Sequence, residues 1–316
     1  MAKVLAVFGA TGKQGGSVVN YVLNDPELSK RYKIRAITRD VNSEQSKQLK
    51  NVEVVQGDVL DPASLDAALT GVHTIFLMTA PSFGPDRFDV EYNSVKAVAD
   101  LAINKGVEYI IFSTLPDVIG ISGGKYTKVT PFDAKAAAEQ YIRRLPIKSA
   151  FYCPGSFMEN FHTQPFLNPR QAPDGTWVMA RHTSPKTQFP LIDAVGDSGK
   201  FVGAILNEPD GFEGKRICGA TKLYTLEEIV AILSKATGKT IVYKQIPLEE
   251  FRDGLMIAFG GMDIIADIYV EAFSYGEEFG YYGPDTEKQV AWAAEQARGT
   301  LSTFEEYLAA HPLQLE

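Results

Sequence analysis

The chain has 316 residues, of which 45% are hydrophobic and 22% are charged, a balance typical of a globular protein with a large core. Its formal net charge of −8 argues against direct binding to nucleic acid or to an anionic membrane surface, because both favour a basic protein. No apolar run reaches the ~20 residues that span a bilayer. The first apolar run begins at the amino terminus with no targeting peptide before it, so we expect a cytoplasmic location, with nuclear access left open.

The first fifteen residues carry the strongest motif. An apolar run over 4–8 is too short for a helix, and Gly9, Gly12 and Gly15 follow it before a helical pattern begins. This order predicts a buried strand, a tight turn and a helix whose free N–H groups favour a pyrophosphate. Gly9 permits the turn, Gly12 lets a ligand approach, and Gly15 lets helix and strand pack closely. The alternative is a structural turn without a ligand. The predicted dinucleotide contacts here are Gly9, Thr11, Gly12, Lys13, Gln14 and Gly15.

Further strands alternate with helices through the first half of the chain. The predicted strands cover 32–38, 52–59, 73–78, 109–114 and 147–152, and strong helices are predicted over 88–105 and 132–144. Six strands that alternate with helices predict an α/β fold with a doubly wound, parallel Rossmann sheet.

Residues at the carboxyl ends of parallel strands border the ligand crevice of such a sheet. Arg39 ends the second strand, where an arginine accommodates a 2′-phosphate, so NADP(H) is favoured and NAD(H) is the weaker candidate. The alternative for Arg39 is a solvated surface pair with Asp40. Asp58 and Val59 are predicted beside the adenine, and Asp58 could equally be a turn residue that bonds its own backbone.

The ends of the later strands supply further candidates. Small residues after the fourth strand let the cofactor backbone approach, and we predict contacts there from Met78, Thr79 and Ala80. Ser113 and Thr114 either orient a substrate carbonyl or merely cap the fifth strand. The predicted cofactor contacts at the end of the sixth strand are Tyr152 and Gly155.

Beyond residue 154 the periodic pattern loosens. Short strands are predicted over 177–179, 188–192, 215–220 and 240–245, and helices over 198–207, 248–259 and 264–273. Thr225 and Thr303 each open a further helix with an acid three residues later, the pattern of a capping box. The segment 120–124 is glycine-rich and is predicted to be a mobile loop near the site. We assign 1–155 to an NAD(P)-binding Rossmann domain, expect 194–207 to return to it, and assign 156–316 to a smaller substrate or partner lobe.

Cysteines and histidines do not indicate a metal. Cys153 and Cys218 lack metal-ligand spacing and are predicted to be buried apolar residues, and no histidine pair has helical metal spacing. His162 either lines the cleft between the lobes or is a packed polar residue. The other predicted cleft residues in its aromatic segment are Phe157 and Asn160.

These residues together resemble the NmrA-like family, an atypical branch of the short-chain dehydrogenase/reductase superfamily. The likeness rests on the 9–15 turn, Arg39 and the segments 154–161, 234–239 and 303–307, and it covers nearly the whole chain. It implies a Rossmann domain, a smaller carboxyl-terminal lobe, a cleft between them and NADP(H) binding. Some members are redox-sensing regulators that bind other proteins, and others are reductases.

The superfamily's usual catalytic pair is a tyrosine four residues before a lysine. Here the lysine is Lys135, and Pro131 stands in place of the tyrosine. Lys135 would then hold the nicotinamide ribose, or act as acid or base as the resemblance to isoflavone-reductase-like enzymes implies. The alternative is a solvent-facing lysine.

The sequence leaves two functions open. The missing tyrosine favours a redox-sensing regulator with a protein partner. The alternative is an NADPH-dependent reductase of a small aromatic, carbonyl or quinone-like substrate that uses Lys135. Oligomeric state is not indicated.

Overall fold

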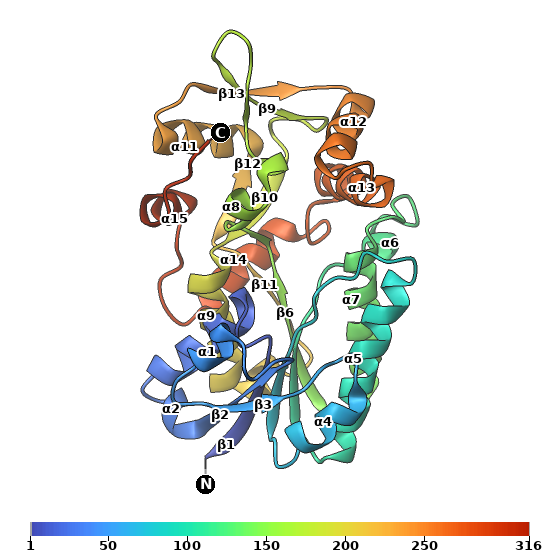
Figure 1. Cartoon of the computed structure of the whole chain (residues 1–316), viewed down its shortest axis with the longest axis vertical. Helices are drawn as coiled ribbons and strands as arrows, with labels where there is room; N and C mark the ends of the chain where they lie inside the picture. Colours follow the sequence, from blue (N-terminus) through green and yellow to red (C-terminus); the bar gives the residue numbers. More distant parts are fainter. Residues whose placement is uncertain (1, 316) are drawn as a thin grey trace.

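Strand β1 (Lys3–Phe8) explains the layered architecture of the amino-terminal half. Leu5 and Val7 are buried on one face of the strand, and Ala6 and Phe8 are buried on the other. Because both faces are covered, the strand is a continuous apolar run. The computed structural model describes residues 2–315 and stacks a smaller carboxyl-terminal lobe on this helix-covered sheet (Figure 1).

The central sheet has seven parallel strands in the order β11-β6-β5-β4-β1-β2-β3. Its other strands are β2 (Tyr32–Thr38), β3 (Glu53–Gln56), β4 (Thr74–Leu77), β5 (Tyr109–Ser113), β6 (Lys148–Pro154) and β11 (Arg216–Gly219). The predicted Rossmann fold is confirmed. Strand β1 pairs with both β2 and β4, so the winding direction changes there, and ligands of such sheets bind at this point.

One strand lies in a different sheet from the one expected. The sequence placed 215–220 in the smaller lobe, whereas β11 pairs in parallel with β6 at the edge of the central sheet. The preceding helix α9 (Ala194–Asn207) packs against α1 (Lys13–Asn24) and so returns the chain to this sheet. A strand's own apolar pattern does not state which sheet it joins.

Helices cover both faces of the central sheet (Figure 1). Helices α1 and α9 share one apolar core with the β1 face that carries Leu5 and Val7. The opposite core is formed with α4 (Pro62–Ala68), α5 (Arg87–Asn104) and α7 (Thr130–Ile142). The short helices of this half are α2 (Leu28–Arg31), α3 (Glu44–Lys47), α6 (Val118–Ile121) and α10 (Pro209–Phe212).

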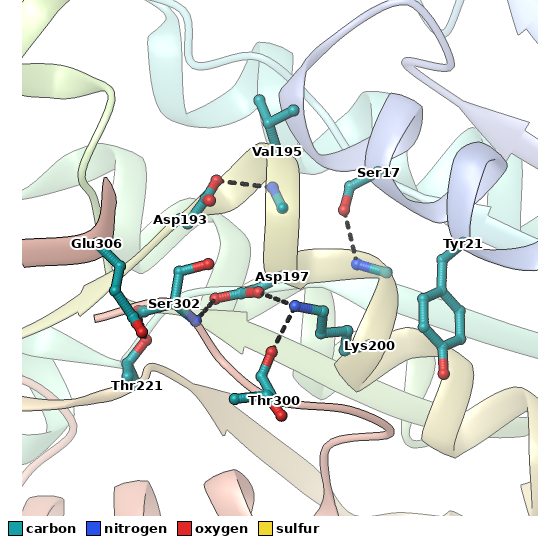
Figure 2. A network of polar contacts seen from close by, with 12 residues as sticks. Ser17, Tyr21, Asp193, Val195, Asp197, Lys200, Thr221, Thr300, Ser302 and Glu306 are labelled. Carbon is teal, nitrogen blue, oxygen red and sulfur yellow. Dashed lines mark hydrogen bonds and ion pairs between the residues drawn. The ribbon is translucent and has the colours of Figure 1, made fainter. Parts of the chain in front are cut away.

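Helix α9 lies close to α1 because it presents glycines to it. A Cβ on Gly199 would lie 2.5 Å from the carbonyl oxygen of Ser17 and from the Cβ of Tyr21. The Gly199 N–H donates to the Ser17 hydroxyl at 2.8 Å (Figure 2). A side chain at Gly203 would meet the Tyr21 ring. This contact fixes α9 against the helix that follows the glycine turn.

Asp197 of α9 anchors the carboxyl-terminal segment. The Lys200 ammonium donates to one of its carboxylate oxygens at 2.6 Å, and the Ser302 N–H donates to the other at 2.8 Å (Figure 2). Lys200 also donates to the carbonyl of Thr300 at 2.6 Å. Burial raises the pKa of Asp197, and these donors oppose that shift. The network ties residues 300–302 to the sheet half of the molecule.

The smaller lobe contains two three-stranded sheets, ordered β12-β10-β7 and β13-β9-β8. Their strands are β7 (Ser156–Phe157), β8 (Arg170–Gln171), β9 (Trp177–Arg181), β10 (Gln188–Ile192), β12 (Lys222–Thr225) and β13 (Ile241–Gln245). Its helices are α8 (Asn160–Thr163), a 3-10 turn (Pro165–Leu167), α11 (Leu226–Thr237), α12 (Leu248–Ala258), α13 (Asp263–Phe279) and α15 (Phe304–Ala310). Helix α14 (Thr286–Gln296) contacts β11 and α9 of the sheet half as well as β12.

The predicted capping boxes at Thr225 and Thr303 are confirmed. Each threonine side chain accepts from the N–H of the third helical residue, and the glutamate at that position accepts from the N–H of the threonine. Other parts of this half differ from the prediction. Helix α13 continues past 273 until Gly280, whose φ is +78°, and α14, β8 and β12 are additional elements. The segment expected as a loop from Gly120 begins inside α6, which Asp117 caps.

The chain crosses between the lobes at neighbouring points. Gly155 joins β6 to β7, and its N–H donates to the Gly219 carbonyl at 2.9 Å, where β11 ends. A Cβ on Gly155 would lie 2.5 Å from the Pro190 carbonyl oxygen in β10. The Thr221 N–H donates to the Leu191 carbonyl at 2.9 Å. None of the helices within residues 2–315 has the length and apolar character needed to cross a membrane.

Candidate functional site

The glycine turn after β1 has the steric features expected of Gly9 and Gly15. Gly9 has a φ of +64°, and the Gly12 N–H donates to its carbonyl at 2.8 Å. A Cβ on Gly15 would overlap that same Gly9 carbonyl. Only glycine therefore allows α1 to begin so close to the end of β1.

The first turn of α1 is suited to an anion. Its N-cap residue, Gly12, has no side chain to cap the helix, and the first turn contains no acid. The free N–H groups and the helix dipole then favour a negative group, and Lys13 adds a cation. The turn thus fits a pyrophosphate, although contact of Thr11 or its neighbours with one stays a prediction.

The candidates predicted to lie near the adenosine differ in their surroundings. Arg39 is exposed and forms no ion pair among residues 2–315, so its guanidinium is available to a phosphate. Asp58 accepts the Leu60 N–H at 3.0 Å, which is the self-bonded turn considered as its alternative. Val59 packs against the core beneath α4. Adenine recognition by Asp58 and Val59 stays a prediction.

A cavity of about 470 Å³ lies between the ends of the central strands and the smaller lobe. Most of its wall is apolar or aromatic. The predicted site residues that line it are Gln14, Met78, Thr79, Ala80, Ser113, Thr114, Lys135, Gly155, Phe157 and Asn160. The structure therefore brings the candidates from α1, β4, β5, α7 and the 155–160 segment to one place.

Lys135 is held by a buried polar cluster. Lys135 is 7% exposed, and its ammonium forms an ion pair with Glu91 of α5. Glu91 is 3% exposed. The same ammonium donates to the Thr79 carbonyl at 3.0 Å and to the Thr79 hydroxyl at 2.8 Å. The Thr79 hydroxyl donates to Glu91 at 2.7 Å. The solvent-facing alternative for Lys135 is wrong.

The electrostatics of this cluster balance two effects. Burial lowers the pKa of Lys135 because it penalises the charged ammonium, and the Glu91 carboxylate offsets only part of this fall. The three ammonium donors have three acceptors on Thr79 and Glu91. Lys135 is consequently fixed in position at the cavity wall.

The strand-end hydroxyls are also bonded within the protein. Ser113 donates to the Gln14 side-chain oxygen at 2.7 Å, which connects β5 with the first turn of α1. Thr114 donates to the Lys135 carbonyl at 3.4 Å. Both residues line the cavity, and substrate contact by either of them stays a prediction.

Tyr152 and His162 are predicted at the cofactor site and the cleft, but neither lines the cavity. Tyr152 is fully buried, donates to the Ser198 hydroxyl at 3.0 Å and stacks on Phe201, because its position on β6 faces α9. This corrects its prediction as a cofactor contact. His162 is exposed on α8, and its ring nitrogens contact the His311 carbonyl at 3.2 Å and the Tyr307 hydroxyl at 3.3 Å. His162 therefore does not line the cleft, and it contacts Tyr307 and His311 from an exposed position.

Several residues of the site have no distinguishing signal in the sequence. Glu91 lies on a helix with several charged residues, and Arg181 lies just beyond the predicted strand 177–179. Tyr275 lies beyond the predicted end of its helix, and its buried hydroxyl has no hydrogen-bond partner within residues 2–315. Burial raises the pKa of Tyr275, so its phenol stays protonated. The aromatic and polar residues that the smaller lobe adds to the wall include Phe161, Gln164, Arg181, Phe189, Tyr269, Phe273, Tyr275 and Tyr281.

Comparisons with known proteins agree with this architecture. Among curated relatives, an NmrA-like family domain-containing protein of Dictyostelium discoideum is 29% identical, covering 98% of this chain and 97% of the relative. The NmrA-like family domain-containing oxidoreductase FrzB of Cladobotryum sp is 29% identical, covering 78% of this chain and 77% of the relative.

Solved structures share the fold at lower identity. NmrA, a negative transcriptional regulator in complex with NADP, has a TM-score of 0.77 at 22% identity, covering 97% of this chain and 94% of that one. The NADPH-dependent quinone oxidoreductase QOR2 of Escherichia coli, complexed with NADPH, has a TM-score of 0.74 at 22% identity, covering 97% and 99%. The model of the NmrA-like family matches residues 1–308 of this chain. The chain belongs to the NmrA-like family.

Proposed function

We propose that this protein is an NADP(H)-dependent reductase of a small aromatic, carbonyl or quinone-like substrate. The observation that carries the proposal is the aromatic-walled cavity of about 470 Å³, which runs from Lys135 into the smaller lobe. Its volume is in the range of small-molecule sites. The missing tyrosine favours a regulator in the sequence, whereas the aromatic-walled cavity favours a small-molecule substrate.

The cofactor is assigned to the glycine turn and the cavity mouth. The uncapped first turn of α1 suits the pyrophosphate, and the exposed Arg39 suits a 2′-phosphate. The family's solved regulator with NADP and the quinone oxidoreductase with NADPH support this assignment. NADPH, when bound, would supply the hydride to the substrate.

Lys135 is the proposed proton donor at the reacting end of the cavity. Reduction of a carbonyl or quinone oxygen consumes one proton in addition to the hydride. The Lys135 Nζ is held by Thr79 and Glu91, so donation requires one N–H to exchange its Thr79 acceptor for the substrate oxygen. Burial lowers the pKa of Lys135, which makes proton release easier than from an exposed lysine. Glu91 and Thr79 act as positioning residues, because they hold the ammonium and not the substrate.

The test is NADPH oxidation by the full chain across a panel of quinones and aromatic carbonyls. We expect turnover with part of the panel, and a loss of about 100-fold or more in Lys135→Met, the scale of general acid catalysis. Because Lys135→Met leaves the buried Glu91 carboxylate without its cation, the double variant Lys135→Met, Glu91→Gln is measured beside it. Lys96→Met is the matched control, since Lys96 also pairs with an acid but on the surface of α5. Absence of NADPH oxidation over the whole panel would contradict the proposal.

A second function, a redox-sensing regulator, is favoured by one surface feature. At the turn from α12 to α13, Ile257 is 78% exposed and Met262 is 52% exposed, with the exposed Ile264 beside them. Exposed apolar side chains of this kind suit a protein partner. Helix α13 also lines the cavity through Tyr269 and Phe273, so ligand state and this surface share one element.

Hydrogen exchange tests the regulatory candidate without a known partner. If the protein senses redox state, saturating NADP+ and NADPH should give different exchange rates over residues 255–270. Equal rates with the two forms would remove the basis for a switch.

A further inference from the structure

Arg181 occupies a position where an apolar side chain is expected. In β9 the buried side chains alternate as Trp177, Met179 and Arg181, so the arginine continues the apolar face of the strand. It is 5% exposed and lines the cavity beside Met179. Burying a cation on this face removes its hydration, and the free-energy cost has to be compensated by a partner.

The partners of Arg181 within the chain are all uncharged. Its guanidinium donates to the Ala180 and Leu167 carbonyls, each at 2.7 Å, and lies over the rings of Phe251 and Phe273. Its Nε has no hydrogen-bond partner within residues 2–315. No carboxylate in the described part of the chain forms an ion pair with it.

The other cation of the cavity is different. Lys135 is neutralised by Glu91, whereas the described residues that line the cavity include no aspartate or glutamate. Burial lowers the pKa of Arg181 to about 10, which leaves it protonated at neutral pH. The cavity therefore contains one uncompensated positive charge, and it lies in the smaller lobe.

We propose that Arg181 binds the anionic group of the substrate, and that the substrate class is an aromatic acid or phenolate. The anion would pair with the guanidinium of this lining residue and replace its lost solvation. The aromatic body would contact the rings of Phe189 and Phe273, which share the wall with Arg181. This inference rests on the proposed function for the statement that the bound acid is a substrate.

A matched pair of ligands tests the anion preference on the unmodified protein. Isothermal titration at neutral pH, without cofactor, compares 2-naphthoate with its neutral analogue 2-naphthamide. We expect naphthoate to bind at least about tenfold more tightly, which corresponds to about 1.4 kcal/mol. Equal or weaker binding of naphthoate overturns the inference, and this comparison does not depend on any variant folding.

Matched variants locate the preference. Arg181→Met should remove the tenfold advantage of naphthoate while leaving naphthamide affinity within about twofold. Arg170→Met, which removes an exposed arginine from the neighbouring strand β8, should leave both affinities unchanged. An equal loss of the naphthoate advantage in the two variants overturns the assignment to Arg181, because general electrostatic attraction would explain it.

The outcome is separable from that of the proposed function. A naphthoate preference lost in Arg181→Met supports the anion site even if no compound oxidises NADPH, in which case the reductase proposal fails alone. Reduction of neutral quinones without a naphthoate preference overturns the anion site and leaves the reductase proposal standing.

Discussion

Lys135 of α7 and Glu91 of α5 form a buried ion pair that joins two helices behind the carboxyl end of β4. Thr79 completes the cluster by accepting from the lysine and donating to the glutamate. Breaking one partner of a buried pair is costly because the other charge stays in a poorly solvated place. The pair is thus both a structural contact and the support of the proposed proton donor.

Glu91→Gln should destabilise the protein by about 3–5 kcal/mol at neutral pH. Without the carboxylate, the pKa of Lys135 falls further, because burial is then unopposed. A lysine whose folded pKa is depressed binds fewer protons than in the unfolded chain, so the lost stability returns as pH rises towards the ordinary lysine pKa of 10.5. Urea unfolding at neutral and alkaline pH checks this, with Glu44→Gln in an exposed ion pair as control. If the difference in unfolding free energy between wild type and Glu91→Gln does not shrink at alkaline pH, the explanation is wrong.

Asp133 of α7 should give the protein a stability that falls with rising pH. Burial raises its pKa to about 6 from 3.8, since only the Ile119 N–H, at 3.0 Å, and weaker backbone contacts compensate the charge. A carboxyl with a raised folded pKa stabilises below pH 4, and that contribution is lost by about pH 6. Asp133→Asn should therefore gain up to about 3 kcal/mol relative to wild type over this range. Denaturant unfolding across the range, with the exposed Asp89→Asn as control, measures it; parallel curves for wild type and Asp133→Asn would rule the effect out.

Two adjacent glycines of α1 should respond differently to alanine. In Gly15→Ala the new methyl overlaps the Gly9 carbonyl, so we expect a loss of about 1–3 kcal/mol and weaker NADPH binding. In Gly16→Ala the methyl lies 3.4 Å from the Ala10 carbonyl oxygen, and alanine's higher helix propensity should offset or exceed the strain, by up to about 1 kcal/mol. Thermal unfolding and NADPH titration of both variants make the comparison. Similar behaviour of the two would remove the steric argument for Gly15.

Arg39→Ala should weaken NADPH binding about tenfold or more and leave NADH binding within about twofold. The guanidinium is exposed at the end of β2, and a charge-assisted bond to a 2′-phosphate contributes about 1.5–3 kcal/mol. Lys33→Ala removes an exposed cation from the other end of the same strand and serves as the control. Fluorescence titration with both nucleotides decides the matter, and an equal loss for NADH would exclude a 2′-phosphate role.

The Rossmann half could be predicted from the sequence because its signals are local. The β2 bounds agree residue for residue, and the steps from Gly9 to Gly15 identify a turn that only glycine permits. Lys135 could be selected from the resemblance to the family. In each case the information lies within one element and its flanks.

The cavity wall from the smaller lobe could not be predicted in this way. Arg181 follows a short apolar strand as an exposed arginine would, and Glu91 is one acid among several polar residues of α5. Tyr152 has the pattern of a strand-end residue, yet it faces α9. The face that each side chain takes depends on helices far along the chain, which local periodicity does not encode.

The neighbouring crossings at Gly155 and Thr221 restrict how the two lobes can move. Each crossing is hydrogen-bonded to another, as in the bonds from Gly155 to Gly219 and from Thr221 to Leu191. Neither crossing is therefore a free linker that can rotate alone. Because residues 300–302 are also bonded to Asp197 and Lys200 of α9, a change in the angle between the lobes has to deform several hydrogen-bonded connections together, and this makes the cleft stiff.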